Sequence, residues 1–170
     1  MMDYSLKSGK NALRASKEIA NAAGADGMIG GQVVDILSEE KETLSEEELK
    51  YMHLKKTGVL IRSSIVAGAI LGDANESDIE KFDIFGQKLG LAFQIKDDLL
   101  DVLGSVDKLG KNTNKDEDKN KSNFVTMYGI DRCEYLCKEL TEESISILND
   151  LTVDAKYLKE LTYNLLDREY

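Results

Sequence analysis

Three closely spaced aspartates are the residues in this sequence best suited to chemistry. Asp97, Asp98 and Asp101 interrupt the segment GLAFQIKDDLLDVLG, residues 90–104, which otherwise has the composition of a protein core. At about 100° per residue, a helix would place them in one acidic sector about 100° wide, with apolar residues over most of the remaining surface. The same sector contains four further residues, Asp83, Gln87, Gly90 and Gln94.

The acidic sector has two interpretations. A run of charged residues is usually the solvated face of an amphipathic helix, and the periodicity alone favours that explanation. A solvated face normally mixes charges, however, because like charges four residues apart repel each other, and no lysine separates Asp97 from Asp101 in this sector. Adjacent carboxylates on a rigid helix suit a hard divalent cation such as Mg²⁺, which takes oxygen ligands.

Lysines near the aspartates would suit an anionic ligand. Lys55, Lys56 and Thr57 precede Gly58, where we expect a break in a helix. More lysines lie in the polar segment 105–121, which we expect to be a loop: Lys108, Lys111, Lys115, Lys119 and Lys121. Lysines beside a metal-binding sector suit a polyphosphate. Taken singly, each is better explained as an ordinary surface lysine.

Helices account for the apolar pattern along the chain. The 170 residues include no proline, and apolar residues recur at spacings of three and four, so the sequence predicts one all-α domain over residues 1–170. The expected helices cover residues 6–23, 28–37, 45 to about 72, 77–104, and two or three segments within 122–170. Ser45 and Ser77 are expected to be N-caps, with Glu48 and Glu80 three residues later.

Composition argues against several classes of protein. The formal net charge of −10 opposes non-specific binding to nucleic acid, which needs a basic face. The longest apolar tract, residues 59–72, falls short of the roughly 20 residues of a membrane span. No signal peptide is evident at the N-terminus. We expect Cys133 and Cys137 to be reduced, structural thiols in a cytoplasmic protein.

Three ordered motifs make the sequence resemble the trans-polyprenyl diphosphate synthases, the group of farnesyl and geranylgeranyl diphosphate synthases. The FQ..DD..D spacing of the second aspartate-rich region in that family is matched by Phe93, Gln94, Asp97, Asp98 and Asp101, followed by Gly104 and Gly110-Lys111. The GGQ..D segment is matched by Gly30, Gly31, Gln32 and Asp35, and the H..KTG segment by His53, Lys56, Thr57 and Gly58. The resemblance runs from about residue 10 to the end and implies a helical bundle of the isoprenoid synthase type.

The resemblance also implies roles for individual positions. It implies catalytic residues Lys56, Thr57 and Gln94, substrate-binding residues Gln32, Lys56, Lys111 and Lys121, and metal ligands Asp97, Asp98 and Asp101. Mg²⁺ on the aspartates would bridge to the diphosphate of the allylic substrate, which Lys56 and Lys121 would contact. Thr57 and Gln94 would face the allylic cation that forms as diphosphate leaves and that isopentenyl diphosphate attacks. Metal and lysines would thereby stabilise the growing charge on the leaving group. His53 would be structural or would support the residues that line the site.

The sequence departs from the family pattern at points that bear on activity. The family has a first aspartate-rich motif with an arginine pair nearby, whereas Asp97-Asp98 is the only Asp-Asp pair here and no Arg-Arg pair occurs. We therefore expect the chain to be the C-terminal half of the fold, with the N-terminal helices missing. The segment NKSNFV, residues 120–125, also carries Asn-Phe-Val where the family usually shows Thr-Tyr-Pro.

These observations favour a split or truncated short-chain synthase, with farnesyl diphosphate as the default product. We expect the chain alone to be inactive and to act as a homo-oligomer or with the missing N-terminal half. One alternative is a non-catalytic regulatory or scaffold subunit of a prenyl synthase, although such a subunit would not need an intact aspartate set. Another is an unrelated helical module with an acidic surface, which three ordered motifs disfavour.

Overall fold

Helices form every regular element in the part of the chain that the structure describes. The computed structural model describes residues 2–38, 44–109, 122–166 and 168, with the side chains of residues 2–8 and 105–109 excepted. The elements are α1 (Met2–Ala23), α2 (Met28–Ser38), α3 (Glu46–His53), η1 (Leu54–Gly58), α4 (Val59–Leu71), α5 (Glu76–Leu109), α6 (Phe124–Tyr128), α7 (Ile130–Asn149) and α8 (Lys156–Leu166). The predicted all-α class is confirmed.

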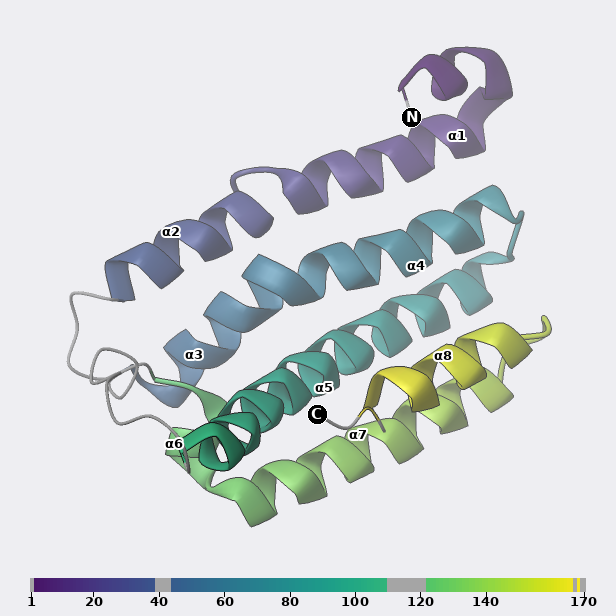
Figure 1. The fold of residues 1–170 in the computed structure, drawn as a ribbon. Coiled ribbons are helices and arrows are strands. Elements are labelled where there is room, and N and C mark those ends of the chain that lie inside the picture. The colour runs from purple at the N-terminus through teal and green to yellow at the C-terminus, as the bar shows by residue number, and fades with distance from the viewer. Residues whose placement is uncertain (1, 39–43, 110–121, 167, 169–170) are drawn as a thin grey trace.

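The long helix α5 is the centre of the bundle. It packs against α4 on one side and α7 on the other, as Figure 1 shows. The helices α3, η1 and α4 follow one another in a row beside α5, and α1 and α2 form the next row outward. The C-terminal half of α5 therefore lies close to η1 and to the short helix α6, and this is where the predicted site residues lie.

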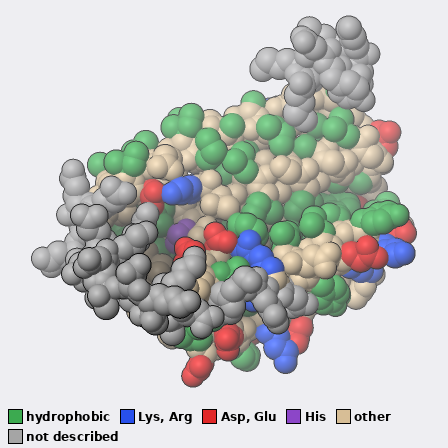
Figure 2. Space-filling view, in the orientation of Figure 1, with side chains coloured by type: hydrophobic (Ala, Val, Ile, Leu, Met, Phe, Trp, Pro, Cys, Tyr) green, Lys and Arg blue, Asp and Glu red, His purple; other side chains and the backbone are tan. Residues whose placement is uncertain are grey.

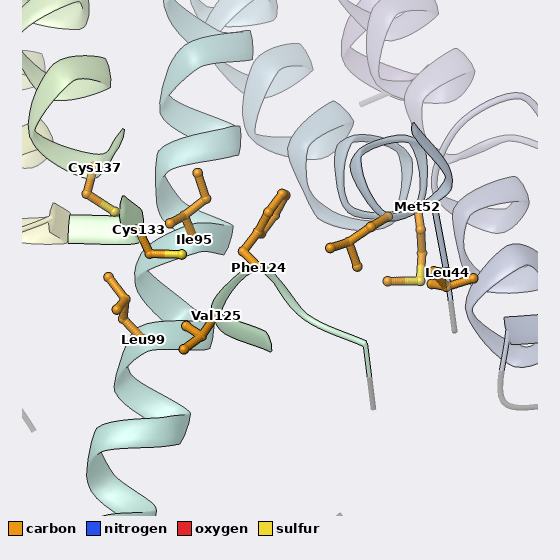
Figure 3. Close-up of a cluster of buried hydrophobic side chains, with 9 residues drawn as sticks. Leu44, Met52, Ile95, Leu99, Phe124, Val125, Cys133 and Cys137 are labelled. Carbon is orange, nitrogen blue, oxygen red and sulfur yellow. The ribbon is translucent and has the colours of Figure 1, made fainter. Parts of the chain in front are cut away.

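A buried apolar cluster holds the helices together at this end of α5. It joins residues of α3, α5, α6 and α7, including the side chains labelled in Figure 3: Leu44, Met52, Ile95, Leu99, Phe124, Val125, Cys133 and Cys137. Both cysteines are free and buried, as the sequence predicted. Burial raises the pKa of Cys133 to about 11 and that of Cys137 to about 12, so both thiols are neutral at pH 7 and serve as packing groups.

The sequence predicts the start of α3 correctly but not the start of α5. Ser45 caps α3 with a complete capping box, as expected. The prediction of Ser77 as the cap of α5 is wrong, because the Asn75 side chain accepts the Asp78 N–H at 2.9 Å and α5 begins at Glu76. α5 also continues to Leu109, beyond the expected end at Gly104, since polar residues without proline do not stop a helix. The rest of the expected loop lies outside the described residues.

An apolar face is exposed on the outer row of helices. Apolar side chains gather over α1 and α2 in the space-filling view (Figure 2), and four of them on α2 are about half exposed: Ile29, Val33, Ile36 and Leu37. Their spacing places them along one side of the helix. None of the helices in the described ranges is both long and apolar enough to cross a membrane.

Candidate active site

A turn of π-helix carries the lysine motif. The Val59 N–H donates to the Leu54 carbonyl five residues earlier, so η1 contains one residue more per turn than an α-helix. We expected a break in the helix near Gly58. Instead, α3 continues through η1 into α4 without a gap. The extra residue changes the direction in which Lys55, Lys56 and Thr57 leave the helix, and turns of this kind are frequent at functional sites.

Glycines bring the three motifs into contact. A Cβ atom on Gly31 would lie 2.3 Å from the backbone nitrogen of Lys56, and one on Gly90 would lie 2.8 Å from the Cα atom of Gly58. Real Cβ atoms essentially never approach other atoms so closely, so any side chain at either position would push the helices apart. α2, η1 and α5 can pack this tightly only because these residues are glycines.

The two lysines of η1 have different partners. Lys56 Nζ donates to the Asp35 carboxylate at 2.6 Å, and this carboxylate is almost fully buried. Lys55 Nζ donates instead to the Asp26 carbonyl at 2.7 Å and lies over the Tyr51 ring. A lysine ammonium has three donors, so Lys56 can keep Asp35 and still bind an anion. Asp35 thus ties the Lys56 ammonium of η1 to α2.

Asp98 points into the protein. It is 6% exposed and accepts the Phe124 N–H at 2.8 Å and the Gln94 side-chain amide at 3.1 Å. The His53 ring lies beside it, with Nε2 4.0 Å from the carboxylate, and contacts the Phe124 ring in a tilted arrangement. Burial raises the pKa of the Asp98 carboxyl, and the two hydrogen bonds oppose that rise. Asp98 therefore connects α5 to the start of α6.

Asp97 and Asp101 are more accessible and lie one turn apart on α5. Asp101 is exposed, and the Asp97 side chain is 46% exposed and accepts a hydrogen bond from Arg168 at 2.5 Å. Their hard oxygen donors fit Mg²⁺, which keeps several water ligands and needs only one or two protein carboxylates. Within the described ranges, no three His, Cys, Asp or Glu side chains gather into a metal-binding group. The structure thus separates Asp98 from the other two aspartates.

The remaining predicted residues within the described ranges lie on three different elements, η1, α5 and α2. Thr57 is partly exposed on η1, Gln94 is partly exposed on α5 and donates to Asp98, and Gln32 is exposed on α2. Lys111 and Lys121 lie outside the described residues. Asp35 and Arg168 were not among the predicted site residues. The GGQ..D spacing gave a signal for Asp35, and the resemblance marked Arg168 as a basic residue kept near the end of the chain, but nothing in the sequence indicated that it contacts Asp97, 71 positions away.

Comparison with known proteins identifies the family. The model of the polyprenyl synthetase family matches residues 2–161. The chain belongs to the polyprenyl synthetase family. It is 37% identical over 150 residues to the farnesyl diphosphate synthase of Micrococcus luteus and 36% identical over 160 residues to that of Bacillus subtilis. These matches cover 88% and 94% of the chain, and 51% and 52% of the two relatives.

Solved structures of family members share the fold. The geranyltransferase of Helicobacter pylori, in complex with magnesium and isoprenyl diphosphate, matches with a TM-score of 0.76 and 29% identity over 98% of this chain and 54% of that one. The geranyltransferase of Legionella pneumophila matches with the same TM-score at 26% identity, over the same shares of the two chains. The chain thus spans about half the length of the curated relatives it matches. The family consists of Mg²⁺-dependent prenyltransferases.

Proposed function

We propose that this chain supplies the second aspartate-rich half of a short-chain polyprenyl diphosphate synthase, with farnesyl diphosphate as the default product. The reaction would join an allylic diphosphate to isopentenyl diphosphate in the cytoplasm. Family membership supports this proposal, and so does the packing of η1, which carries the lysine motif, against α5, which carries the aspartates. The packing of Gly58 against Gly90 is the observation that carries it, because it joins a cationic motif to an acidic one.

Each group would have a distinct task in this half-site. Asp97 and Asp101 would hold Mg²⁺, which supplies positive charge to a departing diphosphate. Lys56, held by Asp35, would donate to the same diphosphate, and Lys111, Lys121 and Gln32 are proposed as further substrate contacts. Thr57 and Gln94 would turn their oxygens toward the allylic carbon as positive charge develops there. Asp98 would keep Gln94 and the start of α6 in place through its hydrogen bonds.

Neighbouring lysines give a matched test of the diphosphate site. We expect Lys56→Ala to weaken Mg²⁺-dependent binding of geranyl diphosphate by about 10-fold or more, because a hydrogen bond to a charged group contributes about 1.5–3 kcal/mol. Lys55→Ala removes the same charge from the same turn but leaves Lys56 on Asp35, and we expect a change below about twofold. Binding would be followed by ³¹P NMR on the purified chain. Equal effects of the two substitutions would contradict the proposed site.

The exposed face of α2 favours a second polypeptide in the complete enzyme. Ile29, Val33 and Ile36 would be covered either by a complementary N-terminal half or by a second copy of this chain. The same face also suits the alternative function, a non-catalytic regulatory or scaffold subunit that docks on a complete synthase. The two functions differ in one respect, because only the split enzyme needs Asp97 for turnover.

A further inference from the structure

One arginine connects the end of the chain to the aspartate motif. Arg168 follows α8, and its guanidinium donates to Asp97 Oδ1 at 2.5 Å. The same guanidinium lies 4.5 Å from the centroid of the Phe93 ring, on the preceding turn of α5. The Arg168 side chain is 29% exposed, so the ion pair is partly shielded from water. Charge and ring contact together hold Arg168 over Asp97.

One hydrogen-bond donor of Arg168 has no acceptor among the described residues. The Nε atom of Arg168 is buried, and none of the described residues offers it a hydrogen-bond acceptor. A buried donor without a partner loses its hydration and gains nothing in return. The position of Arg168 over Asp97 therefore carries a cost that would be relieved if the side chain moved to water. This distinguishes it from Lys56, whose ammonium bonds a buried carboxylate on α2.

We propose that Arg168 acts as a latch that neutralises Asp97 in the metal-free chain and is displaced when a divalent cation binds there. The proposal rests on the metal-binding role proposed for Asp97. A guanidinium and a divalent cation on the same carboxylate repel each other, so the two compete for it. By linkage, binding of the cation weakens the Arg168 contact by the same factor as the contact weakens binding of the cation.

Cation binding provides the first test. We expect Arg168→Gln to bind Mn²⁺ about two- to fivefold more tightly than the wild-type chain, the range expected for a partly exposed ion pair. Arg132→Gln is the matched control, because Arg132 also lies over an aromatic ring, that of Tyr135, and its removal changes the net charge equally. Free Mn²⁺ would be measured by electron paramagnetic resonance at low ionic strength. The control is expected to match wild type.

Asp97→Asn separates the failure of this inference from the failure of the proposed function. If Asp97→Asn binds Mn²⁺ as wild type does, Asp97 is no ligand and both proposals fall. If Asp97→Asn weakens binding but Arg168→Gln leaves it unchanged or weaker, the latch alone is refuted. The latch is equally refuted if neither the wild-type chain nor Arg168→Gln binds Mn²⁺ measurably, because Arg168 would then not be what withholds the carboxylate.

Hydrogen exchange gives a readout that does not depend on affinity. Addition of saturating Mn²⁺ to the wild-type chain should speed amide exchange in the last turn of α8, at residues 163–166, because Arg168 no longer ties that turn to α5. In Arg168→Gln, exchange there should already be fast and should not respond to Mn²⁺. Circular dichroism would confirm that the variant keeps its helices. Unchanged or slower exchange in the wild-type chain would overturn the latch.

Discussion

Asp98 shows how three adjacent carboxylates can have different environments. It shares a motif with Asp97 and Asp101, yet its carboxylate is buried and bonded to the Phe124 N–H, whereas theirs reach solvent. Burial raises its pKa, which means that folding favours the protonated form. Its contribution to stability is therefore largest below the ordinary pKa of an aspartate and is lost as pH rises through the raised value.

Substitution of Asp98 tests this assignment. Asp98→Asn keeps an oxygen acceptor for the Phe124 N–H but cannot ionise, so we expect its Tm to match or exceed that of wild type at pH 7. The difference should shrink as pH falls below the ordinary pKa of aspartate. Asp98→Ala leaves a buried N–H without an acceptor and should lower the free energy of unfolding by about 1–3 kcal/mol. Thermal unfolding at several pH values between about 3.5 and about 7.5 would measure both effects. A larger loss for Asp98→Asn at pH 7 than at low pH would refute the assignment.

The contact between η1 and α5 determines how the lysine motif lies relative to the aspartate motif. Gly58 and Gly90 allow the π-helical turn to pack directly on α5, next to the aspartate motif. The glycine pair appears within recognisable motifs of the sequence, so the meeting of the two elements could be expected. The π-turn itself could not, because η1 has only five residues, too few to show an apolar period of its own.

Two glycine substitutions test this contact. Gly90→Ala would place a Cβ atom 2.8 Å from the Gly58 Cα and should lower the free energy of unfolding by about 1–3 kcal/mol, as overpacking does. Gly68→Ala on α4 is the control, because a Cβ atom there meets nothing within 4 Å and should stabilise the helix by about 0.5–1 kcal/mol. Urea unfolding would measure both changes. A Gly90→Ala chain as stable as wild type would mean that the helices do not pack this closely.

Residues near in sequence were easier to predict than contacts between distant ones. The Ser45 capping box is encoded within four residues and was predicted, whereas the cap of α5 depends on which of two polar residues, Asn75 or Ser77, meets Asp78. The acidic sector of α5 was predicted from periodicity, but the inward turn of Asp98 depends on the backbone of α6, 26 positions away. Long-range partners of this kind leave no periodic signal in one sequence.

The whole molecule combines a formed half-site with an exposed apolar face. Asp97 and Asp101 lie on α5 and Lys56 lies on η1, which packs against α5, while the α2 face leaves Val33 and Ile36 about half exposed. A chain that spans about half of its relatives' length, with such a face, is expected to need a second polypeptide for turnover. We therefore propose that prenyl transfer by this chain needs a second polypeptide to complete the site, and that it then depends on Asp97.

A prenyl-transfer assay can show whether the chain needs a second polypeptide and whether Asp97 is required. Incorporation of labelled isopentenyl diphosphate onto dimethylallyl diphosphate would be measured with Mg²⁺ for the chain alone and for the chain mixed with the half of the Bacillus subtilis relative that it does not match. We expect no product from the chain alone, product from the mixture, and loss of at least about 100-fold of that activity in Asp97→Asn, since metal ligands stabilise the departing diphosphate. Turnover by the chain alone, or a mixture whose activity survives Asp97→Asn, would contradict the account, and a mixture without activity would favour the non-catalytic subunit.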